Sequence, residues 1–238
     1  MDEFDRMTAH RLPTPTRPLL GLTVLVVEDS RYACDALRLL CLRSGARIRR
    51  ADCLRSARRH LQLYRPSVVI VDMGLPDGSG AELIEELAGA TPRVSVLLGI
   101  SGDSFVEDIA IAAGADGFLS KPLNSLADFQ QAVLTRLPAD QQPSGPRVLP
   151  DDTIKPDPVA YRDDLCHAAD TLSEGKQDEV IEYVAQFLAG IARSAQDMSL
   201  ANAAEAITNA YAKGKVLNAD VVRLNQMVQD RLEREPAI

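Results

Sequence analysis

The chain has 238 residues, of which 46% are hydrophobic and 25% are charged, and this composition is typical of a soluble globular protein with one large domain or two small ones. Its formal net charge of -8 argues against general nucleic-acid binding, which usually requires a basic surface. No apolar run is long enough to span a bilayer, and the first residues lack the apolar core of a signal peptide. We therefore expect a cytoplasmic protein that does not bind a membrane.

The first half of the chain alternates between two kinds of segment. Residues 1–20 are polar and interrupted by proline, which predicts a flexible N-terminal arm. Within residues 21–137, short apolar runs predict strands near 22–27, 46–51, 67–71, 94–100 and 116–120. Segments of helical period lie between and after them, near 31–44, 54–64, 81–88, 105–113 and 123–137. The alternation predicts an α/β domain with a five-stranded parallel sheet, in which the polar second strand occupies an edge.

The second half has a different character. Residues 138–158 are rich in proline and poor in apolar side chains, which predicts an extended, fairly stiff linker. From residue 159 to 238 the apolar residues recur at helical spacing, and we expect helices near 159–173, 177–195, 199–213 and 218–234, separated in part by EGK and KGK turns. The natural packing of four such helices is an all-α bundle.

Polar residues follow four of the predicted strands. Glu28 and Asp29 follow the first strand, Asp72 ends the third, Ser101 ends the fourth and Lys121 follows the fifth. In an open parallel sheet these carboxyl ends form the ligand site. Three neighbouring carboxylates must keep a proton or hold a cation, and Mg²⁺ is the simpler solution. Asp72, which is central, could then attack phosphorus and form an acyl phosphate whose oxygens Lys121 and Ser101 bind.

These residues carry a resemblance to a known family. VLVVEDS, VVIVDMGLPDGSG, GISG and GADGFLSKP occur in the order and spacing of the receiver domain of two-component response regulators, which are bacterial signalling proteins. The resemblance covers about residues 22–137 and implies a flavodoxin-like, doubly wound fold. It also implies a phosphorelay in which a histidine kinase or a histidine-phosphotransfer protein donates a phosphoryl group to Asp72.

The resemblance further assigns roles to individual residues. It implies that Glu28, Asp29 and Asp72 bind Mg²⁺ together with the backbone carbonyl of Gly74, and that Lys121 binds the phosphoryl group. Ser101 would be the switch hydroxyl and Phe118 the switch aromatic residue. Gly74 departs from the family, which usually has a larger side chain there, and we hypothesise that the smaller residue admits water and alters the lifetime of the phosphoryl group.

One surface feature is independent of these motifs. Ten arginines lie between Arg31 and Arg65, against only Asp35 and Asp52 in the same stretch, although the protein as a whole is acidic. The charge is either a solvated face or a docking surface for an acidic partner. In the family, the first helix is typically where the phosphodonor domain binds.

The second half lacks the features of the common output domains. From Ala160 to the C-terminus eight Lys and Arg stand against thirteen Asp and Glu, which argues against DNA binding. It has no HExxH motif and no Gly-rich phosphate loop, and His167 has no evident metal or triad partner. The four cysteines of the chain lack CxxC spacing and are expected to be reduced packing residues. We therefore expect no dedicated catalytic domain.

Residues 185–200, AQFLAGIARSAQDMSL, are weakly similar to the histidine-phosphotransfer (HPt) motif. Gln186 stands where that motif has its phosphorylated histidine and Ala189 where it has a lysine. If the similarity is real, the bundle is a degenerate, HPt-like binding module. The alternative is an unrelated amphipathic bundle.

We predict a response regulator whose phosphorylation at Asp72 switches a helical interaction domain that does not bind DNA. One alternative is a phosphorylation-independent scaffold or homodimer built on a receiver fold. Another is a phosphatase or anti-kinase activity of the bundle, for which Gln186 and exposed acids are the candidates.

Overall fold

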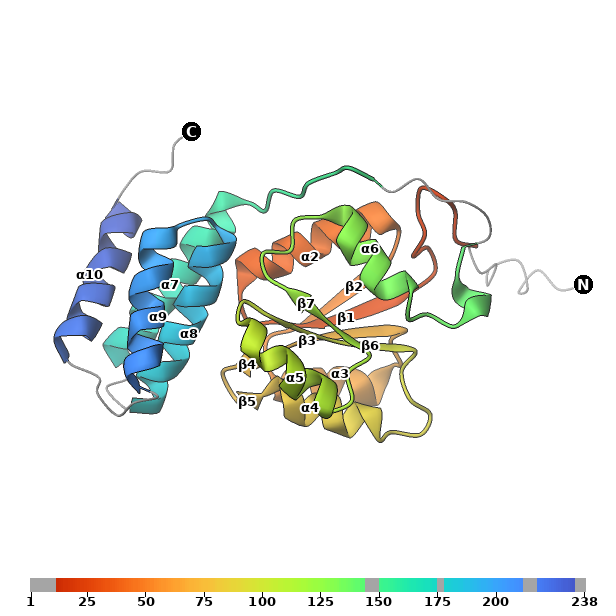
Figure 1. Ribbon diagram of the computed structural model, residues 1–238, viewed down its shortest axis with the longest axis horizontal. Coiled ribbons are helices and arrows are strands. Elements are labelled where there is room, and N and C mark those ends of the chain that lie inside the picture. Colours follow the sequence, from red (N-terminus) through yellow and green to blue (C-terminus); the bar gives the residue numbers. More distant parts are fainter. Residues whose placement is uncertain (1–11, 144–149, 175–177, 212–217, 234–238) are drawn as a thin grey trace, which may run out of the picture.

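The computed structural model describes residues 12–143, 150–174, 178–211 and 218–233. Its N-terminal half is a five-stranded sheet in the order β2-β1-β3-β6-β7, and each strand is parallel to its neighbours (Figure 1). The strands are β1 (Thr23–Val27), β2 (Arg47–Ala51), β3 (Val68–Asp72), β6 (Val96–Ser101) and β7 (Gly117–Ser120). The predicted flavodoxin-like α/β fold is confirmed, and β2 lies at the edge as its polar sequence predicts.

Helices cover both faces of this sheet. Those of the domain are α2 (Arg31–Ser44), α3 (Leu54–Leu63), α4 (Gly80–Ala88), α5 (Glu107–Ala112) and α6 (Leu126–Leu134), and a hairpin of β4 (Gly74–Leu75) and β5 (Gly78–Ser79) follows β3. Short 3-10 turns lie at Ser104–Val106 and Ala139–Gln141. Helices α2 and α6 pack on one face and α3, α4 and α5 on the other (Figure 1). Every residue of β3 is therefore buried, which explains its unbroken run of apolar side chains.

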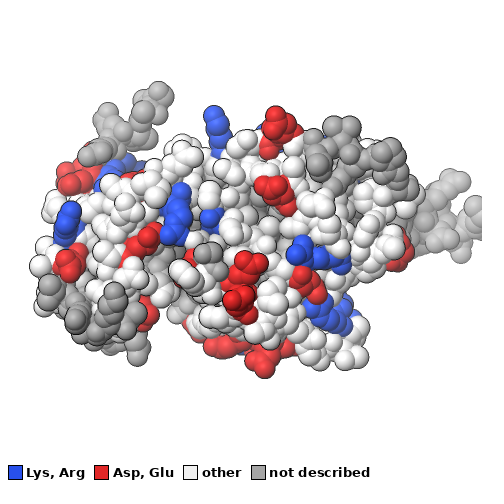
Figure 2. Space-filling model, viewed as in Figure 1, with Lys and Arg blue, Asp and Glu red and all other residues white. Residues whose placement is uncertain are grey.

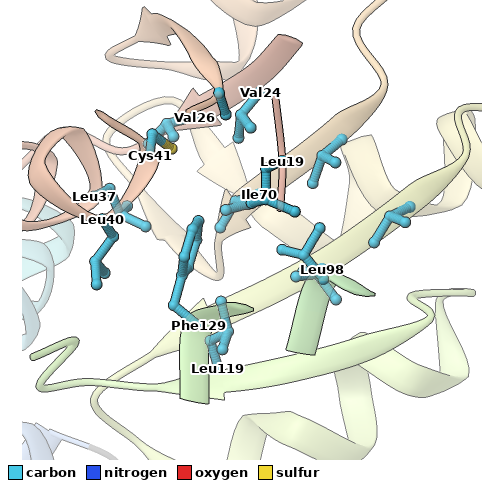
Figure 3. Packing of buried hydrophobic residues seen from close by; sticks show 14 of the residues in the cluster. Leu19, Val24, Val26, Leu37, Leu40, Cys41, Ile70, Leu98, Leu119 and Phe129 are labelled. Carbon is cyan, nitrogen blue, oxygen red and sulfur yellow. The ribbon is translucent and has the colours of Figure 1, made fainter. Parts of the chain in front are cut away.

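Two segments that we expected to be free pack on this domain. The flexible arm predicted for residues 1–20 is wrong near its end, because Leu19 is fully buried among the core residues under α2 and α6 (Figure 3). The Leu19 amide donates a hydrogen bond to the carbonyl of Ser44. Residues 1–11 lie outside the described residues. Burial of the apolar Leu19 side chain stabilises this position even though residues 13–18 before it are polar or proline.

The second correction concerns the linker predicted for residues 138–158. Ile154 is 2% exposed and joins the same core, and its amide donates to the carbonyl of Asn124. Thr153 forms a β-bridge with Ser125, and the Asp157 amide donates to Asp35 on α2. Residues 150–157 are therefore a docked strap along α2 and α6. One buried isoleucine and a few backbone hydrogen bonds outweigh the polar composition that predicted a free linker.

The second half forms a four-helix bundle with a core of its own. Its helices are α7 (Pro158–Glu174), α8 (Asp178–Ser194), α9 (Met198–Tyr211) and α10 (Asn218–Glu233), close to the ranges predicted. Leu188, Ala192, Leu200 and Ile207 are among its buried residues, each at most 1% exposed. The predicted EGK and KGK turns lie largely outside the described residues. None of the helices described has the length and apolar character needed to cross a membrane.

Candidate functional site

The parallel sheet brings the predicted polar residues together at one edge. Glu28 and Asp29 follow β1, and Asp72 is the last residue of the neighbouring strand β3. Strand β6 pairs with β3 and β7 pairs with β6, and their carboxyl ends place Ser101 and Lys121 at the same edge. Consecutive parallel strands point their carboxyl ends the same way, so local strand signals were enough to find these residues.

Three of these residues form an acidic cluster. Glu28, Asp29 and Asp72 each place a carboxylate oxygen within 4.8 Å of the others. The ammonium of Lys121 lies 2.7 Å from Glu28 Oε2 and donates a hydrogen bond of 3.1 Å to Asp72 Oδ2. Lys121, Glu28 and Asp72 have almost no exposed side-chain surface. One cation therefore faces three carboxylates in a poorly hydrated site.

The pKa values of the cluster reflect this excess of negative charge. Burial, followed by the charge of a neighbouring carboxylate, raises the pKa of Asp72 to about 7 and that of Asp29 to about 6. Burial also raises the pKa of Glu28 to about 7, although Lys121 opposes the shift. For Lys121 burial acts against the charged form, but Asp72 and Glu28 outweigh it and raise the pKa of the ammonium. A hard divalent cation would relieve the repulsion, and three carboxylate ligands fit such an ion.

The backbone around Asp72 fits tightly. Gly80, the first residue of α4, approaches so closely that a Cβ atom on it would lie 2.0 Å from the carbonyl oxygen of Asp72. The Gly80 amide donates to the carbonyl of Met73. Any side chain at residue 80 would therefore push β3 and α4 apart, and the glycine fixes the position of Asp72.

Of the remaining predicted site residues, two line a cavity beside the acidic cluster and one packs against the apolar core. Ser101 is partly buried and lines a cavity that also contains Asp72 and Lys121. Gly74, in β4, is exposed and lines the same cavity. The partly buried ring of Phe118 packs beside Gly99 of β6, and it belongs to the apolar cluster under α3, α4 and α5.

The helical bundle covers this edge of the sheet, which the sequence did not predict. The cavity is about 330 Å³, and its walls come from both halves of the chain. Helix α8 lies against β4 (Figure 1) and contributes Tyr183, Gln186, Ala189 and Gly190 to the wall. The Tyr183 hydroxyl donates a hydrogen bond of 2.5 Å to Asp29 Oδ2. The bundle thus reaches directly into the acidic cluster.

A second contact joins the bundle to the start of α2. The Asp164 carboxylate on α7 accepts hydrogen bonds from the amides of Arg31 and Tyr32, at 2.8 and 3.0 Å, and from the Ser30 hydroxyl at 2.7 Å. The first turn of α2 contains no acidic residue of its own. Asp164, which is 2% exposed, therefore supplies the negative charge that a helix N-terminus favours.

Further contacts extend the interface on both sides. The rings of Tyr32 and Tyr161 meet edge to face with centroids 5.7 Å apart. Arg193 on α8 donates to the carbonyl of Gly102, just after β6, and pairs with Glu205 on α9. The sequence contained no local signal for Tyr183, Asp164 or Arg193, since each acts on a residue far away in the chain.

Comparison with known proteins identifies the first half of the chain. A family model described as the response regulator receiver domain matches residues 24–133. Residues 24–133 form a response regulator receiver domain. The match ends before the bundle, and the HPt-like character predicted for the bundle stays a prediction. The acidic cluster, Ser101 and Lys121 all lie in the receiver domain.

Individual relatives match the same region. The chain is 33% identical over 99 residues to the KDP operon transcriptional regulatory protein KdpE of Escherichia coli, covering 42% of this chain and 44% of the relative. It is 30% identical over 118 residues to the virulence transcriptional regulatory protein PhoP of Salmonella typhimurium, covering 48% and 53%. The chain thus spans about half the length of these relatives. A solved response regulator from Chloroflexus aurantiacus shares 24% identity with a TM-score of 0.45, covering 48% of this chain and 95% of that one.

Proposed function

We propose that this protein accepts a phosphoryl group on Asp72 from a histidine of a kinase or a phosphotransfer protein in the cytoplasm. Glu28, Asp29 and Asp72, with the backbone carbonyl of Gly74, would hold Mg²⁺, which offsets negative charge when bound. Lys121 and Ser101 would bind the phosphoryl oxygens. The acidic cluster with its single buried ammonium supports this assignment.

The bundle is the element that phosphorylation would control, and we assign it an interaction role that is neither DNA binding nor dedicated catalysis. On the face shown in Figure 2 its basic side chains lie singly among acidic ones. Ser101 and Phe118 would relay the change within the receiver domain, to the face formed by α5, β7 and α6.

The hydrogen bond from Tyr183 to Asp29 is the observation that carries this proposal. Asp29 would hold Mg²⁺ with the same carboxylate that accepts the hydrogen bond from Tyr183, so the two interactions would compete. A phosphoryl group on Asp72 adds bulk and charge beneath α8. Both changes weaken the docked arrangement, so phosphorylation would shift the population toward a released bundle that is free to meet a partner.

Incorporation of labelled phosphate tests the acceptor role. The full chain is incubated with a small-molecule phosphodonor and Mg²⁺, with Asp72→Asn as the control, and the phosphate bound per chain is measured. We expect incorporation that depends on Mg²⁺ and disappears in Asp72→Asn. A folded wild-type chain that incorporates no phosphate would contradict the proposal and favour the phosphorylation-independent scaffold.

A further inference from the structure

Gln186 is an exposed polar side chain on the surface of α8 that meets the receiver domain. It lines the cavity that also contains Asp72, Ser101 and Lys121. Its Nε2 atom lies 3.4 Å from Glu182 Oε1 on the same helix, and its Oε1 atom is directed toward β4. A Cβ atom at Gly74 would lie 3.8 Å from Gln186 Oε1. The missing side chain of Gly74 therefore leaves the amide open to the site.

The cavity between the docked bundle and the receiver domain is large enough to hold a phosphoryl group and a water molecule. Its volume of about 330 Å³ compares with roughly 30 Å³ for one water molecule in the liquid. The wall on α8 includes the small residues Ala189 and Gly190. A phosphoryl group on Asp72 and a water molecule can thus occupy the space beneath Gln186 together. Among the α8 residues that line the cavity, Gln186 is the one with a side-chain amide, and this neutral group can contact the water.

We propose that Gln186 positions a water molecule for hydrolysis of the phosphoryl group on Asp72, so that the docked bundle accelerates the chain's own dephosphorylation. This inference rests on the proposed acceptor role of Asp72. The reaction needs little covalent help from the protein, because phosphoryl transfer is catalysed mainly by positioning and by electrostatic stabilisation. Glutamine is suited to the task, since its carbonyl oxygen accepts a hydrogen bond from the attacking water and adds no repulsive charge.

The step balances without another reactant. The water oxygen forms a bond to phosphorus on the side opposite Asp72, and the bond between phosphorus and the Asp72 oxygen breaks. The electron pair of that bond returns to Asp72, which becomes a carboxylate again. The two protons of the water pass to the released inorganic phosphate or to solvent. Lys121 lies 3.1 Å from Asp72 Oδ2 and stabilises the carboxylate that forms.

The decay of phosphate from the purified, labelled full chain tests this role. We expect Gln186→Ala to slow the first-order decay roughly tenfold, the effect of losing about one hydrogen bond to the reacting water. Gln226→Ala is the matched control, because Gln226 is an exposed glutamine on α10, outside the cavity lining, whose amide donates a hydrogen bond to Asp230. It should decay at the wild-type rate.

A second variant approaches the same contact from the receiver side. Gly74→Met keeps the backbone carbonyl but fills the space in front of Gln186 Oε1, and it should also slow the decay. Amide hydrogen exchange of Arg31 and Tyr32 reports docking through Asp164, and it should be unchanged in Gln186→Ala. Slower decay with intact docking distinguishes a direct role of Gln186 from a merely structural one.

The outcomes separate this inference from the acceptor role. A chain that is labelled on Asp72, but loses phosphate equally fast with and without Gln186, overturns the inference alone. Slower decay that is matched by a loss of amide protection in Gln186→Ala also overturns it, since Gln186 would then act only by holding the bundle. A chain that takes no label on Asp72 overturns both.

Discussion

Gly80 illustrates how one residue without a side chain fixes the carboxyl end of a strand. An added Cβ atom would lie 2.0 Å from the backbone oxygen of Asp72, and backbone cannot move aside as the end of a flexible side chain can. We predict that Gly80→Ala destabilises the receiver domain by about 2 kcal/mol through overpacking. Denaturant unfolding measures the loss. Gly89→Ala, whose Cβ would lie 3.6 Å from the Glu85 carbonyl, should be close to neutral, and equal losses in both variants would refute the argument.

The sequence predicted the position of the acidic cluster but not what covers it. Glu28 and Lys121 each follow an apolar strand and Asp72 ends one, so their convergence depends only on the parallel sheet. Tyr183 and Asp164 are different, because on their own helices they look like ordinary polar positions. Their roles depend on the docking of one domain on the other, and no local spacing encodes that.

At the scale of elements, the start of α2 combines its own N-cap, Ser30, with a carboxylate from the other domain. Asp164 accepts three hydrogen bonds there, whereas its neighbour Asp163 makes an exposed ion pair with Arg31. We predict that Asp164→Ala weakens docking by about 2 kcal/mol, since a buried charged acceptor is lost. Exchange of the Arg31 and Tyr32 amides should become at least roughly tenfold faster.

The adjacent substitution Asp163→Ala provides the control for this prediction. Exposed ion pairs contribute little to stability. We therefore expect almost no change in the hydrogen-exchange rates of the Arg31 and Tyr32 amides. Equal acceleration by Asp163→Ala and Asp164→Ala would show that charge in general, and not the cap, holds the domains together.

The bundle has a charged junction of its own. Asp197, just before α9, accepts hydrogen bonds from the guanidinium of Arg231 on α10 and from the Tyr161 hydroxyl. The hydrogen bonds from Arg231 hold the pKa of Asp197 below its usual range, although partial burial opposes the shift. Because this pKa is lower in the folded state, the stabilisation is complete above the ordinary pKa of Asp, about 4, and is lost as the pH falls through the folded value.

We predict that Asp197→Asn reduces the stability of the bundle by about 2 kcal/mol at neutral pH and by much less in acid. The measurement is the amide hydrogen exchange of buried α8 and α9 residues from pH 7 to pH 3. It compares the stability of the bundle in Asp197→Asn and in the wild-type full chain at each pH. A deficit that stays constant over the whole pH range would contradict the proposed role of the Asp197 charge.

At the scale of the whole molecule, the receiver and the bundle form a closed arrangement in which the bundle packs on the start of α2 and on the edge that holds the acidic cluster. The sequence of the basic stretch from Arg31 to Arg65 predicts either a solvated face or a site for an acidic partner. Two of its arginines form ion pairs with acidic residues outside the receiver domain, Arg31 with Asp163 on α7 and Arg43 with Asp152 in the strap. Two others pair within the receiver domain, Arg38 with Asp35 and Arg58 with Glu86.

This arrangement explains why the sequence predicted both folds well and their relation poorly. The periodicity of each half follows from its own core, and the two halves have separate apolar clusters. Docking depends on a few polar contacts at Asp29, at the start of α2 and at Gly102, together with a strap that carries a single buried isoleucine. Such contacts change neither the amino-acid composition nor the hydrophobic periodicity of the sequence, so these patterns cannot predict them.

The central claim is that phosphorylation of Asp72 controls whether the bundle is docked. The most direct measurement is the amide hydrogen exchange of Arg31 and Tyr32 in the full chain, compared before and after phosphorylation in the presence of Mg²⁺, with Asp72→Asn treated identically. We predict that protection of these two amides falls when Asp72 is phosphorylated and stays unchanged in Asp72→Asn. Full protection in a chain that is stoichiometrically phosphorylated would contradict the account.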